Sequence, residues 1–295
     1  MALLLNALVW GVSWWPFRQL AAIGLHPLWA TALIYGFSML CLLAWRPHAW
    51  RGLVAHPALW ALMLASGLTN VGFNWAVTVG DVVRVVLLFY LMPAWSILLA
   101  WWLLGERPTR GSLLRLVMAL AGVMLVLKTA DSPWPVPASA ADGLALMGGL
   151  CFALTNALLR KLQHTPDASR AVAMFAGGAF TATGVALAGM ANGTVPALPA
   201  VSAAWLPLAL LLGAAFLAGN LALQYGAARL AAHQTALVML SEVVFASLSA
   251  VLLGAADLNI RTLAGGGLIG LAALLAAWPA PRGQRPQEMA QRGGG

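Results

Sequence analysis

Ten long apolar runs, separated by short polar segments, limit what this chain can fold into. A helix needs about 20 mainly apolar residues to cross a hydrocarbon core about 30 Å thick. Ten segments of this kind follow one another: 2–22, 28–45, 57–78, 83–103, 110–128, 141–161, 169–190, 203–225, 230–253 and 261–278. They lack the alternation of a membrane β-barrel strand. Because a helix satisfies its own backbone polar groups in lipid, the sequence predicts an all-α polytopic membrane protein with ten transmembrane helices.

The charged residues indicate how the chain lies in the membrane. Only 8% of the residues are charged, against roughly 25% in soluble domains. The net charge of +8 comes from Lys and Arg at the ends of apolar runs, so it does not indicate nucleic-acid binding. With the N-terminus inside, eleven basic residues lie on the inner side and four on the outer side. This bias predicts that both termini are cytoplasmic.

Five apolar runs precede a Pro-rich stretch and five follow it, so the chain divides into two halves. "NWAVTVG" at 74–80 is similar to "NLALQYG" at 220–226, and Arg18 aligns with Arg160. Two repeats of five helices in one chain must cross the bilayer in opposite directions, an arrangement typical of secondary transporters with a substrate site between the repeats. The predicted domains are a first repeat at 2–128, a linker at 129–140, a second inverted repeat at 141–278 and a disordered cytoplasmic tail at 279–295.

Two longer motifs carry a family resemblance. "LMPAWSILLAWWLLGERPT" at 91–109 and "LSEVVFASLSAVLLG" at 240–254 resemble, in their order and duplication, the EamA family of the drug/metabolite transporter superfamily. The second motif departs from the family pattern at Val243, where Pro is usual, and at Ala255 and Ala256, which replace Gly-Glu.

The resemblance implies a function as well as a fold. The tryptophan content and the small polar residues look most like the YddG-type amino-acid exporters within that superfamily. A protein of that type would export aromatic and other neutral amino acids across the bacterial inner membrane by alternating access. It is expected to work as a monomer in the lipid bilayer, without a cofactor and without nucleic acid.

Glu242 is the one acidic residue near the middle of a predicted span, because the other seven lie at or near helix ends or in loops. An ionisable group inside the membrane is a functional candidate. At about 100° per residue, Thr235, Glu242 and Ser249 share one stripe of their helix. The carboxyl group either faces a cavity and binds a substrate ammonium or a proton, or joins helices through hydrogen bonds. Glu242 lies in the motif that resembles the whole family, and transporters of different substrates would have this Glu in common. The resemblance therefore favours a role for the carboxyl group that is at least partly structural.

Uncharged polar and aromatic side chains supply the other candidates. Asn70, Asn74 and Thr78 recur every four residues, and Asn220 with Gln224 repeats this pattern in the second half. Amides suit a neutral or zwitterionic solute, and interhelical hydrogen bonding is their alternative role. Deep aromatic rings could hold an apolar side chain or an ammonium. The candidate substrate-binding residues are Asn74, Asn220, Trp14, Asn70, Thr78, Tyr90, Trp95, His233, Gln224 and Glu242.

Two basic residues correspond between the halves. Arg84 and His233 each lie about one turn into a span, and either could meet a substrate carboxylate. Snorkelling of Arg84 to the outer interface is the expected role of that side chain. His233 remains a candidate for the site.

Other function classes fit the sequence less well. No Walker phosphate loop is present, so ATP is not the expected energy source. "TVGD" at 78–81 is similar to half of an intramembrane aspartyl protease pair, but no second central Asp or His-Glu-x-x-His motif accompanies it, so an enzyme is not predicted. A multidrug exporter of lipophilic cations, with Glu242 as counter-ion and proton site, is the alternative function.

Overall fold

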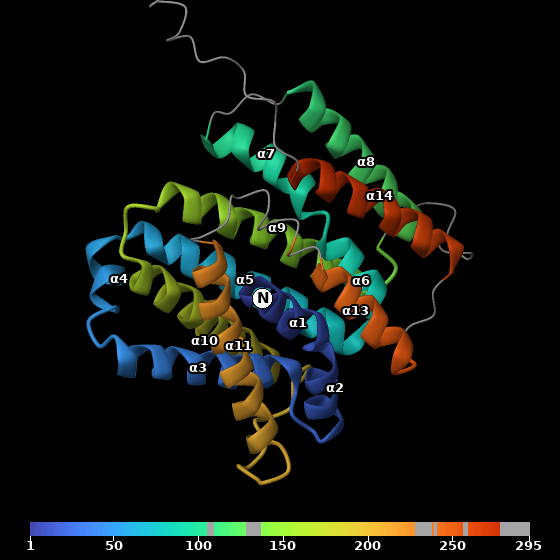
Figure 1. Ribbon diagram of the computed structural model, residues 1–295. Coiled ribbons are helices and arrows are strands. Elements are labelled where there is room, and N and C mark those ends of the chain that lie inside the picture. The colour runs from blue at the N-terminus through green and yellow to red at the C-terminus, as the bar shows by residue number, and fades with distance from the viewer. Residues whose placement is uncertain (105–108, 128–136, 228–237, 239–240, 256–258, 278–295) are drawn as a thin grey trace, which may run out of the picture.

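Within the part of the chain that the computed structural model describes, every regular element is an α-helix (Figure 1). The described residues are 1–104, 109–127, 137–227, 238, 241–255 and 259–277. The helices are α1 Ala2–Val12, α2 Trp14–Ala22, α3 Pro27–Trp45, α4 Arg51–Ala55, α5 Ala58–Val79, α6 Val82–Phe89, α7 Met92–Leu104, α8 Arg110–Leu127, α9 Ala140–Lys161, α10 Asp167–Ala191, α11 Leu206–Ala227, α13 Ser241–Leu252 and α14 Ile260–Ala277.

Several of these helices can cross a membrane by length and composition. Five segments of the described residues qualify: Pro27–Trp45, Val82–Leu99, Ala140–Lys161, Asp167–Ala191 and Leu206–Leu223. Five such segments indicate a polytopic membrane protein, and the count of ten spans stays a prediction. Most of the predicted linker 129–140 and the whole of the predicted tail 279–295 lie outside the described residues.

Two of the predicted spans are broken rather than continuous. The first run consists of α1 and α2, with Ser13 between them, and the fourth consists of α6 and α7, with a turn at Tyr90 and Leu91. Pro16 explains the first break, because a proline has no N–H for the preceding turn and its ring clashes with that turn's carbonyl. The Ser13 hydroxyl donates to the Trp10 carbonyl at 2.8 Å, and that carbonyl also accepts from the Ser13 backbone N–H at 3.3 Å. The predicted spans 2–22 and 83–103 are thus each interrupted, the second within the segment Val82–Leu99 that still qualifies as a span.

The helix that carries Asn70, Asn74 and Thr78, α5, occupies the interior of the bundle. α5 packs against α9, α10, α2 and α3, and Ser66, Thr69, Asn70 and Asn74 on it are all buried. It is not among the five segments that qualify as spans. Polar side chains are costly next to lipid but can hydrogen-bond inside a helix bundle. The sequence of α5 therefore suits a central position that neighbouring helices shield.

Glycines let the helices approach closely around α5. A Cβ atom added to Gly177 of α10 would lie 2.0 Å from the Met63 carbonyl oxygen of α5. The backbones of α5 and α10 thus touch at this crossing, which is typical of helix packing in membranes.

A methyl group at this crossing is expected to destabilise the protein. Gly177→Ala should lower the free energy of unfolding by about 1–3 kcal/mol, because backbone atoms must move to admit the new carbon. Gly184→Ala on the same helix is the matched control, since a Cβ there meets nothing within 4 Å. Thermal unfolding of the purified variants measures the difference. Equal melting temperatures for the two variants would contradict the close crossing.

Candidate functional site

The carboxyl group of Glu242 lies inside the bundle and is hydrogen-bonded to Tyr90. The Tyr90 hydroxyl donates to Glu242 Oε2 at 3.1 Å, and the two residues are 3% and 8% exposed. Tyr90 directly follows α6, at the break in the fourth predicted span. Within the described part of the chain, Glu242 has no ion pair. The break therefore presents a neutral donor to a buried carboxyl group.

Trp14 makes an equivalent contact from the other broken span. Its indole N–H donates to Ser249 Oγ at 2.9 Å, and the side chain is 3% exposed. Trp14 is the first residue of α2, and Ser249 lies seven residues after Glu242 on the same stripe of α13. The two helix breaks thus face one side of α13. We call Trp14, Tyr90, Glu242 and Ser249 the Glu242 cluster.

The backbone of α1 reaches α13 at the same level. A Cβ atom on Gly11 would lie 2.8 Å from the Glu242 carbonyl oxygen and 2.7 Å from Phe245 Cβ. No larger residue fits this crossing without a shift of α1 or α13. The first broken span is consequently held against the helix that carries Glu242.

A second polar cluster joins α5 to α3. The Tyr35 hydroxyl donates to Asn70 Oδ1 at 2.7 Å, and Asn74 Nδ2 donates to Thr31 Oγ1 at 3.2 Å. Asn74 is fully buried, and its Oδ1 has no hydrogen-bond partner among the described residues. A buried amide oxygen without a donor is costly, so this acceptor is suited to a solute or a water molecule.

Aromatic rings connect the two polar clusters. Phe216 lies 5.6 Å from Tyr35 and 4.7 Å from Trp10 between ring centroids. Trp10 lies 6.0 Å from Phe73, which lies 4.8 Å from Phe89, and Phe89 lies 6.3 Å from Tyr90. These separations fall in the range of favourable edge and tilted ring contacts. The interior between Asn70 and Glu242 is therefore aromatic, and we call these six residues the ring path.

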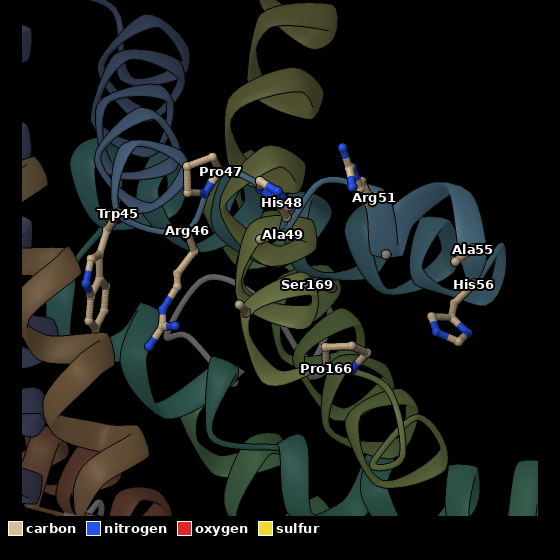
Figure 2. A pocket seen from close by; sticks show the side chains of 12 residues that line it. Trp45, Arg46, Pro47, His48, Ala49, Arg51, Ala55, His56, Pro166 and Ser169 are labelled. Carbon is tan, nitrogen blue, oxygen red and sulfur yellow. The ribbon is translucent and has the colours of Figure 1, made fainter.

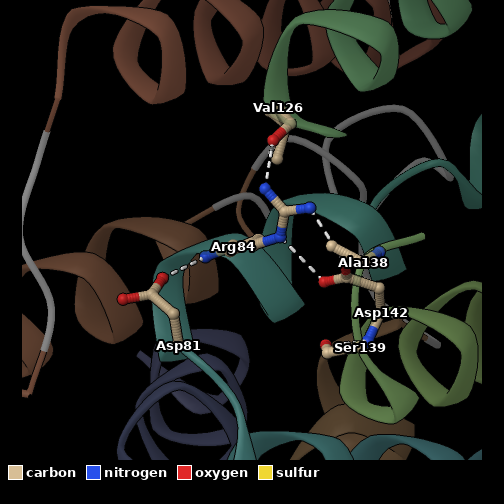
Figure 3. A network of polar contacts seen from close by, with 6 residues as sticks. All are labelled: Asp81, Arg84, Val126, Ala138, Ser139 and Asp142. Carbon is tan, nitrogen blue, oxygen red and sulfur yellow. Dashed lines mark hydrogen bonds and ion pairs between the residues drawn. The ribbon is translucent and has the colours of Figure 1, made fainter. Parts of the chain in front are cut away.

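An ion pair ties the two predicted repeats together near one end of the bundle (Figure 3). Arg84 Nε and Nη2 donate to Asp142 Oδ1 and Oδ2, each at 2.8 Å, and Arg84 Nη1 donates to the Val126 carbonyl. The Asp142 side chain is 2% exposed and also accepts from the Ala138 N–H. Arg84 lies on α6 and Asp142 on α9, so the pair joins residues 2–128 to residues 141–278. The expectation that Arg84 snorkels was wrong, because a bidentate carboxylate is within reach of its guanidinium.

Arg18 fastens the same end of the bundle. Its Nε donates to the Val77 carbonyl at 3.1 Å, its Nη2 donates to the Gly80 carbonyl, and its Cζ lies 5.2 Å from the centre of the Trp14 ring. One guanidinium thus links the end of α5 to α2 and covers Trp14 by a cation–π contact.

The predicted site residues fall into several groups. Trp14, Tyr90 and Glu242 come together in one cluster, and Asn70 and Asn74 lie in the other.

The remaining candidates lie apart from these clusters or cannot be placed. Thr78 donates to the Asn74 carbonyl of its own helix at 2.6 Å, and Trp95 Nε1 is buried without a partner among the described residues. Asn220 is half-buried on α11. The Gln224 side chain and His233 lie outside the described residues.

Sequence reasoning missed the partners of these residues. Tyr35 and Thr31 hold the amides, and Phe73, Phe89 and Phe216 form most of the ring path. Phenylalanines in an apolar run give no signal of their own. Tyr35 was detectable, since a tyrosine hydroxyl inside a span needs a polar partner.

Comparison with known proteins agrees with an all-helical membrane protein. Residues 1–128 match the model of the EamA-like transporter family. One solved structure, titled "Crystal structure of protein", is similar with a TM-score of 0.56 and 21% identity, over 93% of this chain and 94% of that chain. This likeness shows the fold alone. None of the curated proteins compared with the chain matches it. Residues 1–128 are thus similar to transporters of the drug/metabolite type.

Loss of the Arg84–Asp142 ion pair is expected to be costly. Asp142→Asn leaves the Arg84 guanidinium without its carboxylate, and removing one partner of a buried pair costs about 3 kcal/mol. Asp167→Asn is the matched control. Asp167, like Asp142, lies in the first turn of its helix and pairs with an arginine, but its side chain is 83% exposed. An exposed pair contributes at most about 1 kcal/mol. Thermal unfolding of both variants should show the larger fall for Asp142→Asn, and the reverse order would contradict the burial of the pair.

Proposed function

We propose that this protein is a secondary transporter that exports small amphipathic metabolites, chiefly aromatic and other neutral amino acids, across the bacterial inner membrane by alternating access. The observation that carries the proposal is the Glu242 cluster, in which two broken spans meet one helix of the opposite half. Transporter sites are commonly formed at broken helices between repeats. The family match over residues 1–128 supports the same class.

The packing of the helices supports two inverted repeats. We number the predicted spans one to ten, so that α5 is span three and α9 is span six. The corresponding spans of the opposite repeats are span eight, which contains α11, and span one, which contains α1. α5 packs against α9, and α1 packs against α11. The contact of α10 with α5 likewise mirrors that of α3 with α11, and the contact of α9 with α6 and α7 mirrors that of α1 with α13. An exchange of partners between the halves is what a two-fold axis in the membrane plane would produce.

The chemistry of the interior suits a neutral amino acid. The Glu242 carboxylate can hold a substrate ammonium, and Asn74 Oδ1, which has no hydrogen-bond partner among the described residues, is a further acceptor in the interior. The ring path supplies edges and faces for an aromatic or large apolar side chain. Glu242 is one central acid without an ion pair among the described residues, which fits facilitated transport. Such transport needs no cofactor, and a single chain is enough for it.

Alternating access needs contacts that open at one end of the bundle. The Arg84–Asp142 pair and the Arg18 contacts hold the helix ends together on one side of the Glu242 cluster. We infer that the Arg84–Asp142 pair, which joins the two halves, breaks when they rock apart, and that the site then opens to that side. The Arg18 contacts lie within the first half and keep its helices together.

A second candidate function is export of lipophilic cations. It is favoured by the same buried carboxyl group, which sits beside aromatic rings and has no ion pair among the described residues. In that case Glu242 would be both the counter-ion of the drug and the proton site.

A substrate panel distinguishes the two functions. In liposomes containing the purified protein, radiolabelled aromatic amino acids should exchange faster than in empty liposomes and faster than acidic amino acids or lipophilic cations. A lipophilic cation that moves in a proton-dependent way, without amino-acid flux, would favour the second function. Absence of both fluxes in a correctly folded preparation would contradict the proposal.

Substitution of Glu242 separates substrate binding from proton coupling. Glu242→Gln removes a charge-assisted contact to the ammonium, so the KM for amino acids should rise at least about tenfold. The flux of both forms should be unchanged by a proton gradient. Tyr90→Phe should also raise KM, whereas Tyr225→Phe, at a tyrosine that is 58% exposed, should not. Unchanged KM in Glu242→Gln would make the carboxyl group purely structural.

A further inference from the structure

A half-buried arginine and a half-buried aspartate lie near each other at the end of the bundle where α5 ends and α6 begins. Arg18 of α2 donates through Nη2 to the Gly80 carbonyl, and Asp81 is the next residue along the chain. The charge of Asp81 therefore acts on the Arg18 guanidinium. The two side chains form no ion pair within the described part of the chain. Two opposite charges thus lie close together and are not paired.

Each of these side chains keeps a polar group for another partner. Arg18 directs Nε and Nη2 to the carbonyls of Val77 and Gly80, and its Nη1 has no acceptor among the described residues. Asp81 accepts through Oδ1 from the backbone N–H of Arg84 at 2.7 Å. Figure 3 shows the second carboxylate oxygen of Asp81 directed away from Arg84. A guanidinium donor and a carboxylate acceptor are therefore both available here.

The other charged groups nearby are already occupied. The Arg84 guanidinium binds the Asp142 carboxylate and the Val126 carbonyl, on the side of α6 that faces away from Asp81 (Figure 3). A solute held by Arg18 and Asp81 would consequently not compete with the ion pair between the halves.

Trp14 connects this place to the rest of the Glu242 cluster. Its ring centre lies 5.2 Å from Arg18 Cζ, and its indole N–H donates to Ser249 Oγ at 2.9 Å. One indole thus contacts both the helix that carries Glu242 and the guanidinium of Arg18. An amino acid that leaves the Glu242 cluster past Trp14 would next meet Arg18.

An α-amino acid carries its ammonium and its carboxylate on the same carbon, so it fits two opposite charges that are close but unpaired. We propose that Arg18 and Asp81 form a second amino-acid site, in which Arg18 Nη1 binds the carboxylate of the substrate and Asp81 binds the ammonium. Charge-assisted hydrogen bonds of this kind are roughly twice as strong as neutral ones. The inference rests on the proposed function, because it describes the place that an exported amino acid reaches after the Glu242 cluster.

Equilibrium binding of radiolabelled phenylalanine to the purified full chain tests the second site. The measurement is made in the Glu242→Gln chain, because that substitution weakens the central site. Adding Arg18→Gln or Asp81→Asn should lower the affinity for phenylalanine at least about tenfold, since each removes one charge-assisted contact. Asparagine retains an oxygen that can cap α6, so Asp81→Asn is expected to fold.

Arg46→Gln, added to the same chain, is the matched control. Arg46 also lies over a tryptophan, with its Cζ 4.9 Å from the centre of the Trp45 ring, but at the far end of α3 from α2 (Figure 2). This variant should bind phenylalanine as tightly as the Glu242→Gln chain does.

Substrate analogues separate binding from a purely structural role. Phenylalanine methyl ester lacks the carboxylate, and N-acetylphenylalanine lacks the ammonium. Arg18→Gln should remove the preference for phenylalanine over the ester, and Asp81→Asn should remove the preference over the acetylated form. A structural change alone would weaken the binding of all three ligands alike.

Three results would overturn the second site. One is equal phenylalanine affinity with and without Arg18→Gln, in chains that melt at the same temperature. Another is an equal loss for all three ligands, and the third is no phenylalanine binding to the Glu242→Gln chain. If Arg18→Gln does not fold, Asp81→Asn and the comparison of ester with phenylalanine in the Glu242→Gln chain decide between the same outcomes.

The binding measurement also separates this inference from the transport function. Amino-acid flux through liposomes without binding that depends on Arg18 and Asp81 contradicts the second site alone. Binding that depends on both residues, in a chain that gives no flux, contradicts the transport function and leaves the site in place.

Discussion

The hydrogen bond from Tyr90 to Glu242 joins the two halves of the chain at the point where the fourth predicted span is broken. A carboxyl group inside a helical bundle needs a partner, and a continuous helix would not present the tyrosine in the same way. The Trp14–Ser249 contact repeats this solution at the break in the first span. The helix breaks, the close crossing at Gly11 and the buried carboxyl group therefore form one unit, and α13 is its common element.

The rest of the interior follows from keeping polar groups away from lipid. α5 carries the amides and hydroxyls that would be costly at the bundle surface, and it is surrounded by other helices. The ring path from Tyr35 to Tyr90 fills the space between the amides and the carboxyl group. Arg84 and Asp142 pair across the halves near helix ends. The polar character of the side chains thus increases from the aromatic ring path to the two polar clusters, and from these clusters to the charged pair near the helix ends.

Much of the fold was predictable from the sequence, because apolar runs of the required length have few alternatives in lipid. Glu242, Tyr90 and Trp14 could be selected as candidates from the sequence, since each is unusual at its depth. Their partners were not, because contacts between residues 90 and 242 or 14 and 249 depend on how distant helices pack. The helix breaks were hidden for a related reason, as a proline in an apolar run is compatible with a kink as well as with a break. The hydrogen bond of Thr78 to the Asn74 carbonyl of its own helix was not indicated by the four-residue spacing alone.

Alternating access requires that the Glu242 cluster is reached from both sides of the membrane in turn. Ser249→Cys, in a chain whose two cysteines Cys41 and Cys151 are replaced by serine, offers a single thiol at this level. Membrane-impermeant thiol reagents applied to oriented vesicles measure its access from each side. The account predicts labelling from either side, with a transported amino acid changing the ratio of the two rates. Labelling from neither side, or from one side only at a rate that substrate leaves unchanged, would contradict it.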